Sequence, residues 1–377
     1  MPRTKLVSRF LIAIALPGLG CGTGPNPQPR RATDVPDAPS CGSCRIVFTP
    51  LFTLRARGLE ADVPYVANVR TDAAGRFWMF DGERPPLLFD RLGMFVRTVG
   101  KAGDGPGEFR GPTEIVPLPG DSILILDEMA RRGTVLDPNL TPVRNVALPP
   151  KQILPGVVVL RWPDNVVVHV PQEGMPRELG PLLRLSLEGR QAEVLSSFGS
   201  EPDGDTGPDW FVRLYHITPA RSGGHWSADY ALYQLSRWSA DGNRVQVLRR
   251  RTEWFPPPPT NPGGGPNRPP SARIASIVED STGLLWVFSS IAAPTWREAY
   301  APAPLGQRER DPASVALEKL HTTRVEVLDP VAGRVVARSD PGHLIIGALS
   351  EQRVALYTVG RDDQPRVVVA RFTLERR

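Results

Sequence analysis

Cysteine, histidine and lysine are scarce in this chain of 377 residues. A structural zinc site needs about four ligands. The three cysteines and five histidines, none in a spacing such as HExxH, provide no such set. Lysine occurs four times, and the arginines are scattered apart from the run Arg249-Arg250-Arg251. The composition therefore predicts no metal, no cofactor and no nucleic-acid partner, and it indicates a solvated surface instead.

A long apolar run is also missing, which excludes a membrane-spanning helix in the first residues. Arg3, Lys5 and Arg9 precede only seven apolar residues, 10–16, far fewer than the roughly 20 that a spanning helix needs. This pattern is typical of an export signal over residues 1–20. The step Gly18-Leu19-Gly20-Cys21 resembles a lipoprotein cleavage site, although Gly18 stands where leucine is preferred. We expect Cys21 to carry lipid; the alternative is an ordinary cleaved signal.

Residues 21–45 are predicted to be a Pro-rich tether that ends in Cys41-Gly42-Ser43-Cys44. Arg45 stands where a c-type haem site needs histidine, and a thioredoxin-like role needs a βαβ context that is missing. A small disulfide between Cys41 and Cys44 is the favoured interpretation, because an exported protein reaches a compartment where disulfides persist.

From residue 46 onward the chain reads as an all-β domain. Glycine and proline together make up about a fifth of the residues, which indicates many turns but not disorder. Six similar strands begin at residues 76, 122, 165, 224, 284 and 353. Their spacing approaches the length of a propeller blade once the insertions 256–270 and 291–322 are set aside. Asp- and Gly-containing turns recur beside these strands.

The last repeat is one strand short, whereas residues 46–54 form a strand with no repeat of its own. Propellers remove exposed sheet edges by ring closure. We therefore predict a six-bladed β-propeller over residues 46–374, closed by an N-terminal strand that completes the last blade beside residues 366–374.

One stretch adds a family resemblance. The runs Phe89–Gly100, Gly103–Phe109, Pro112–Ile115 and Asp127–Asp137 are similar, in this order, to the NHL repeat of bacterial extracytoplasmic six-bladed propellers. The resemblance covers about fifty residues. It implies a propeller outside the cytoplasm, and some related propellers are metal-dependent lactonases or are lyases.

Few residues suggest chemistry. The Gly103–Gly107 run lacks the Gly-Lys-Ser/Thr ending of a phosphate loop, so an elbow between blades is favoured. Glu114 and Glu279 stand near expected innermost strands, where turn or channel solvation explains them. No catalytic residue is predicted.

The insertion 291–322 is the candidate binding loop, because loops on a rigid scaffold often carry recognition residues. It contains residue types that dominate interfaces, namely Trp296, Arg297, Tyr300, Arg308 and Arg310.

Together these features predict a monomeric, lipid-anchored binding module for a protein, peptide or glycan, facing the periplasm or the cell exterior. The alternative is a propeller enzyme that resembles metal-dependent lactonases or lyases.

Overall fold

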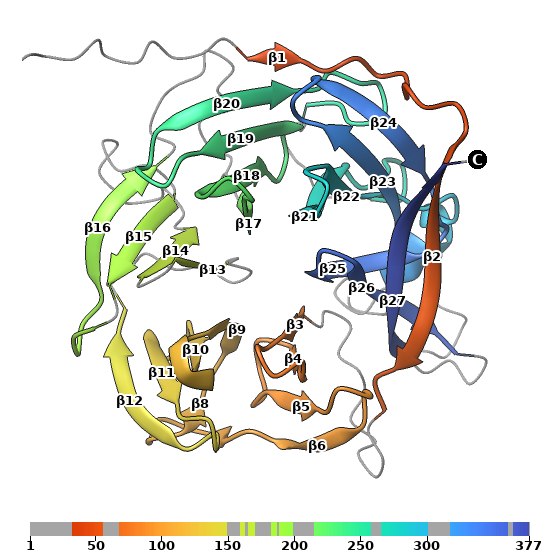
Figure 1. Ribbon diagram of the computed structural model, residues 1–377. Helices are drawn as coiled ribbons and strands as arrows, with labels where there is room; N and C mark the ends of the chain where they lie inside the picture. The colour runs from red at the N-terminus through yellow and green to blue at the C-terminus, as the bar shows by residue number, and fades with distance from the viewer. Residues whose placement is uncertain are drawn as a thin grey trace, which may run out of the picture.

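In the computed structural model, twisted antiparallel sheets stand around a central axis in a propeller-like arrangement (Figure 1). The structure describes residues 32–55, 68–148, 159–162, 165–169, 182–186, 188–198, 215–257, 265–300, 317–360 and 365–376. Over these residues it has one five-stranded sheet, five four-stranded sheets and a two-stranded ribbon. The prediction of an all-β propeller fold is confirmed.

Each large sheet contributes one strand to each of four concentric positions. The innermost strands are β3 (Asn68–Thr71), β9 (Pro112–Pro117), β13 (Val159–Trp162), β17 (Tyr215–Pro219), β21 (Arg273–Glu279) and β25 (Leu344–Ser350). The second strands are β4 (Phe77–Phe80), β10 (Ile123–Asp127), β14 (Asn165–His169), β18 (His225–Asp229), β22 (Leu285–Ala292) and β26 (Arg353–Val359). These second strands are the six repeated strands recognised in the sequence.

The third strands are β5 (Leu87–Phe89), β11 (Arg132–Leu136), β15 (Leu182–Ser186), β19 (Gln234–Trp238), β23 (His321–Asp329) and β27 (Pro365–Arg376). The outer strands are β6 (Phe95–Thr98), β12 (Pro142–Ala147), β16 (Glu193–Phe198), β20 (Arg244–Arg249), β24 (Arg334–Ser339) and β2 (Cys44–Thr53). β2 comes from the start of the domain and is hydrogen-bonded to β27, with register partners from Cys44 and Arg376 to Thr53 and Val368.

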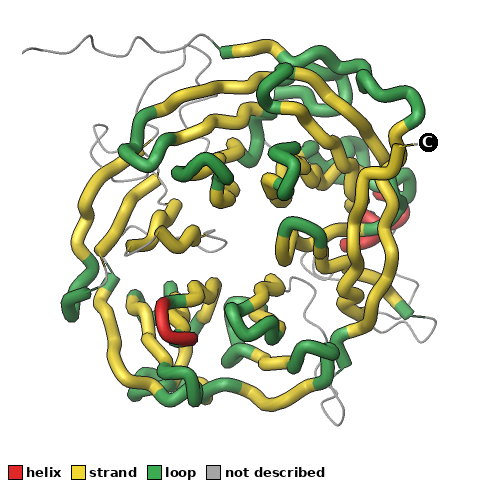
Figure 2. Tube along the Cα trace, viewed as in Figure 1, coloured by secondary structure: helices red, strands yellow, loops and turns green. Residues whose placement is uncertain are grey.

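Short elements complete the described part. They are β1 (Thr33–Asp34), β7 (Lys101–Ala102), β8 (Glu108–Phe109), the 3-10 helices η1 (Pro119–Asp121) and η2 (Trp296–Tyr300), and the helix α1 (Leu317–Leu320). Figure 2 shows how little of the chain is helical. No described helix is long and apolar enough to cross a membrane.

Aspartates form the tight turns between strands, as the sequence predicts. Asp280 accepts the backbone N–H groups of Thr282 and Leu284, and its other oxygen accepts the indole N–H of Trp286 at 2.7 Å. Asp72 makes the same kind of contact with Trp78 at 2.9 Å. The turn at Gly93 needs glycine, because its φ is +80° and a Cβ there would lie 2.7 Å from the ring of Phe52.

The core lies between neighbouring sheets rather than in a single layer. Trp78 and Phe80 from one sheet pack with Ile115, Ile123 and Ile125 of the next. On the other side of the ring, Phe372 of β27 packs with Trp286 and Phe288 of β22, with ring centroids 4.6 and 5.5 Å apart. Aromatic rings fill the wedge-shaped space that widens outward from the axis.

The segment before β2 is partly built into the fold. Thr33 and Asp34 pair in parallel with Leu248 and Arg249 on the outer edge of β20, and Ser40 donates its N–H to the carbonyl of Val335. The predicted tether over residues 21–45 therefore contacts the sheets from about residue 33, and its first part, residues 21–31, lies outside the described residues.

Candidate functional site

A cavity of about 390 Å³ lies along the central axis. Four innermost strands line it: β3, β17, β21 and β25. Its polar lining residues include Asn68, Arg70, His216, Ser276 and Glu279. Apolar lining comes from residues such as Ile217, Ile277, Ile346 and Leu349. A concave, mixed surface of this size suits part of a small ligand or the end of a peptide or sugar chain.

A buried ion pair holds one side of the cavity in place. Arg70 on β3 donates from Nη2 to Oε2 of Glu114 on β9, at 2.7 Å, and Glu114 is almost completely buried. Burial raises the pKa of Glu114, and the charge and hydrogen bond of Arg70 act against that rise. Glu114 therefore supports the arginine that lines the cavity rather than facing solvent, which differs from the channel-solvation role expected for it.

Glu279 is the last residue of β21, and its side chain contacts the neighbouring sheet. Its Oε2 accepts the backbone N–H of Arg221 at 3.0 Å and the indole N–H of Trp226 at 3.1 Å. This contact confirms the turn role expected for Glu279, although the same side chain also lines the cavity.

A cluster of aromatic and basic residues lies where β17 and β21 begin. The His216 and Tyr230 rings stack with centroids 6.3 Å apart. Arg273 donates to the Tyr230 hydroxyl at 2.7 Å, and its guanidinium lies 5.6 Å from the Tyr230 ring centroid. Aromatic faces beside a guanidinium suit the recognition of sugars, peptides and carboxylates.

His321 lies near this cluster, at the start of β23, and it is buried. Burial and the nearby charge of Arg273 lower the pKa of His321 from 6.5 to about 4. Between pH 6.5 and 4 the unfolded state therefore binds the proton that the folded state excludes. The stability that neutral His321 contributes is fully present above pH 6.5 and is lost as the pH falls to about 4.

We expect His321→Phe to flatten the pH dependence of the free energy of unfolding. The flattening between pH 7 and 4 should reach about 3 kcal/mol, measured by urea denaturation at several pH values. His343→Phe, which removes a histidine at an exposed position, is the matched control. Parallel curves for His321→Phe and the wild type would contradict the prediction.

The connections between strands differ strongly in length between the two ends of the sheets. The antiparallel order brings two kinds of connection to the end where the innermost strands begin: those from second to third strands, and those from outer strands to the next sheet. We call this end the loop face. The connections of more than ten residues between described strands all leave from it, namely residues 54–67, 99–111, 148–158, 170–181, 199–214, 250–272 and 293–320, and several of them lie largely outside the described residues. At the opposite end, no connection between two described strands exceeds six residues.

The predicted binding loop at 291–322 belongs to the loop face, and its described residues form a small substructure. Trp296 is buried, with the Arg297 guanidinium 4.4 Å from its ring centroid and the Tyr300 ring 6.3 Å away. The turn is tied to α1, because Ala293 donates its N–H to the carbonyl of Leu320. Arg297 is exposed and Tyr300 is half-buried. Arg308 and Arg310 lie outside the described residues.

The other predicted site residues have different outcomes. Cys41 and Cys44 form a disulfide, which confirms that prediction. Cys21 lies outside the described residues, so its lipidation stays a prediction. The Gly103–Gly107 run is an elbow: Arg132 donates to the carbonyls of Asp104, Gly105 and Glu108, and so fills the turn.

Among the described residues, no group of three or more His, Cys, Asp or Glu side chains is placed to hold a metal ion. Sequence reasoning missed Arg70, Ser276 and Arg273 as lining or rim residues. The signal was weak, because only the strand register shows which residues of an innermost strand point toward the axis.

The fold defines the class of protein, a β-propeller-like all-β protein. No family model matches the sequence, and no curated protein matches it. Two solved structures share the fold at 10% identity. The first is a member of the DUF4221 family from Bacteroides vulgatus, which has a TM-score of 0.54 over 88% of this chain and 97% of its own. The second is a protein of Bacteroides fragilis that is named as an exported protein, with a TM-score of 0.53 over 91% and 100% of the two chains.

A virginiamycin B lyase from Staphylococcus aureus, inactive and in complex with quinupristin, aligns less well. Its TM-score is 0.45 at 10% identity, over 87% of this chain and 99% of the lyase. The two Bacteroides structures share the fold of this chain, and no comparison assigns a substrate or a reaction to it. The NHL-like resemblance stays a prediction.

Proposed function

We propose that the chain is an exported, lipid-anchored binding module that captures a protein, peptide or glycan at the loop face. The observation that carries the proposal is the cluster of His216, Tyr230 and Arg273, which lies at the same end of the sheets as the described part of the 291–322 insertion. Loops at one end of a rigid scaffold are where recognition residues concentrate. The axial cavity shares His216 with this cluster and runs from there along the innermost strands to Glu279 and Glu351 at the opposite end.

The scaffold of this module is proposed to be a six-bladed ring closed by β2. The support is the pairing of β2 with β27, together with six repeated strands that each take the second position in a sheet. A closed ring leaves no open sheet between its first and last blades, so it can hold the loop face in a fixed shape.

The ligand would contact both the cavity and the described part of the 291–322 insertion. Arg297 is an exposed cation, and Tyr300 presents part of its ring beside it. Arginine and tyrosine are frequent at the energetic centres of interfaces. Trp296 would act as the internal support of this substructure, since it is buried.

We expect Gly347→Leu to weaken ligand binding at least tenfold. Gly347 lines the cavity, and its Cβ position is 3.6 Å from Nη1 of Arg70, so a larger side chain would extend into the cavity space. The ligand is first identified by crosslinking in intact cells and by peptide and glycan arrays, and its affinity is then measured by calorimetry. Ser281→Leu, in an exposed turn at the opposite end, is the matched control and should bind normally.

The double variant Arg297→Ala and Tyr300→Ala tests the second contact in the same assay. Unchanged affinity in both this variant and Gly347→Leu would refute the proposed site. A tightly bound divalent ion in elemental analysis of the purified protein, with turnover of a lactone or cyclic peptide, would favour the enzyme alternative instead.

The lipid anchor is tested separately by Cys21→Ser. We expect the wild-type protein to partition with the membrane fraction and the variant to move to the soluble exported fraction. The basis is the short apolar segment that ends next to Gly20-Cys21. A variant that stays as membrane-bound as the wild type would show that Cys21 is not the anchor.

A further inference from the structure

The N-terminal segment Thr33–Asp37 lies along the outer edge of β20 and contacts Arg338 of β24; we call the surface that it covers the groove. It adds a short parallel strand to the edge of β20, and the N–H of Val35 continues the pairing to the carbonyl of Arg249 at 2.8 Å. The side chain of Val35 is buried in the core cluster of the neighbouring sheets. Backbone pairing to an open strand edge, with one apolar side chain inserted, is how many domains bind extended peptides.

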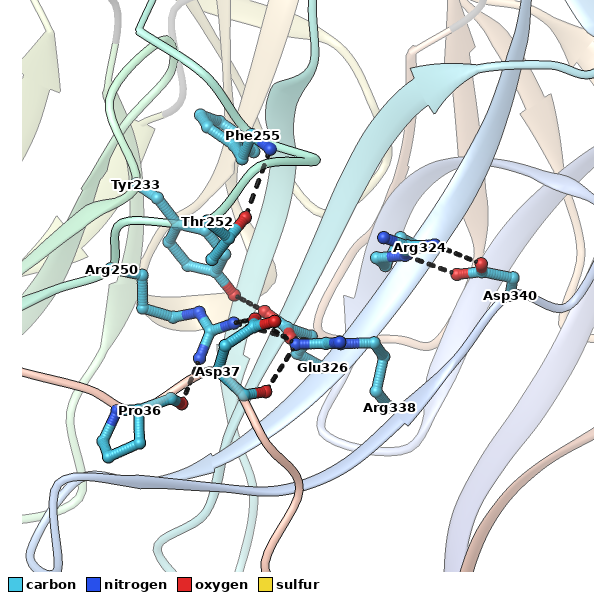
Figure 3. A network of polar contacts seen from close by, with 10 residues as sticks. All are labelled: Pro36, Asp37, Tyr233, Arg250, Thr252, Phe255, Arg324, Glu326, Arg338 and Asp340. Atoms are coloured by element: carbon cyan, nitrogen blue, oxygen red, sulfur yellow. Dashed lines mark hydrogen bonds and ion pairs between the residues drawn. The ribbon is translucent and has the colours of Figure 1, made fainter.

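Two arginines at the end of the groove bind the carboxylate of Asp37 (Figure 3). Nη2 of Arg250 and Nη2 of Arg338 each lie 2.5 Å from Oδ1 of Asp37. Arg250 also donates to the carbonyl of Pro36 at 2.7 Å, so the groove binds backbone and side chain together. Burial opposes the ionisation of Asp37, but the two arginines outweigh it and lower the pKa of this carboxyl.

The floor of the groove has an excess of positive charge without Asp37. Arg250 and Glu326 are both about 1% exposed and lie 3.1 Å apart, and Arg338 donates to the same Glu326 at 2.7 Å. Tyr233 gives the remaining contact to Glu326, at 2.6 Å, as a neutral donor. Two guanidinium groups therefore share one carboxylate, and a buried unbalanced charge is costly. The groove requires an acidic occupant.

The segment in the groove is held over few residues. Only Thr33 and Asp34 form a strand with β20, and in this segment only Val35 is buried, while half of the Asp37 side chain is exposed. Glu326 and Arg338 belong to β23 and β24 of one sheet, and Arg250 directly follows β20 of the neighbouring sheet. The chemistry that holds the segment is therefore a short run of backbone pairing, one apolar side chain and one carboxylate.

We propose that this groove is a peptide-binding site for a partner segment that carries an apolar residue followed, two positions later, by a carboxylate. Residues Thr33–Asp37 occupy it in cis as a built-in competitor. The effective concentration of such a tethered segment is in the millimolar range. A partner therefore gains access when its own local concentration is high or when the N-terminal segment is released.

The experiment uses the full-length chain and a fluorescent synthetic peptide with the sequence of residues 32–40. Asp37→Ala weakens the cis segment, and we expect this variant to bind the peptide at least tenfold more tightly than the wild type, measured by fluorescence anisotropy. A control peptide with asparagine in place of the aspartate at position 37 should bind at least tenfold more weakly than the native peptide. Asp340→Ala is the matched protein control, because it removes a surface carboxylate that binds Arg324 instead, and it should bind like the wild type.

A folded Asp37→Ala variant, shown by its melting curve and intact disulfide, that binds neither peptide or both equally would overturn the proposal. A wild-type dimer that the free peptide dissociates would also overturn it, since the occupant would then be a second copy of the chain. The cavity variant Gly347→Leu should bind this peptide normally, so failure of the groove and failure of the loop-face site can be told apart.

Discussion

A chain that begins at Leu54 is expected to lose cooperative folding. The truncation removes β2, which pairs with β27 over nine residue pairs, and with it Ile46 and Phe48, which pack against the core cluster around Phe372. It also leaves the outer edge of β27 unpaired. Loss of a whole strand and of its packing should cost well above the 0.5–3 kcal/mol of a typical point substitution. The measurement is urea denaturation followed by circular dichroism.

Two shorter truncations are the controls for this result. A chain that begins at Ala32 keeps every described residue and should unfold like the full-length chain. A chain that begins at Cys41 keeps the disulfide and β2 but lacks the segment in the peptide groove, so its loss of stability should be intermediate. If the chain that begins at Leu54 unfolds at the same urea concentration as the one that begins at Ala32, closure of the ring by β2 is refuted.

Glu326→Ala is expected to destabilise the fold by about 3–5 kcal/mol, because it removes one partner from a buried charge network. The carboxylate accepts from Arg250, Arg338 and the Tyr233 hydroxyl (Figure 3). Arg250 is 1% exposed, so it cannot regain water when the carboxylate is lost. Asp37 alone would then face two guanidinium groups.

The control for this substitution is Asp340→Ala in the same strand-to-strand region. Asp340 binds Arg324 at 2.5 Å, but its side chain is 46% exposed. Exposed pairs of this kind contribute about 0–1 kcal/mol. Both variants are compared by urea denaturation at pH 7. If both variants lose the same small amount of unfolding free energy, the charges around Glu326 are screened by solvent as much as those of the surface pair.

Much of the fold could be predicted because its signals are local. The six repeated strands, the Asp-containing turns and the disulfide all depend on residues close together in the sequence. Asp280 and Trp286, for example, are six residues apart and form one turn-and-strand unit. The strand at 46–54 was recognised because it had no repeat of its own, which pointed to the far end of the chain for its partner.

The candidate sites were harder to predict because their residues meet only across sheets. Arg70 and Glu114 are 44 residues apart and come from different sheets. Tryptophan is a residue type that is frequent at protein interfaces, but Trp296 is buried within its own insertion. The sequence also indicated a free tether up to residue 45. In the structure, the carboxylate of Asp37 and the buried side chain of Val35 attach residues 33–37 to the outer strands.

The sequence by itself determined the all-β class, the repeated strands, the turns and the pairing of Cys41 with Cys44, because hydrophobic alternation and turn chemistry act over a few residues. Only the tertiary structure decided where charges and cavities lie. The axial cavity, the Arg70–Glu114 pair and the Asp37 groove depend on the register and twist of neighbouring sheets, which bring residues together across tens to hundreds of positions. No local sequence pattern encodes contacts over such separations in sequence. The burial of a charged side chain depends on the sheets that surround it.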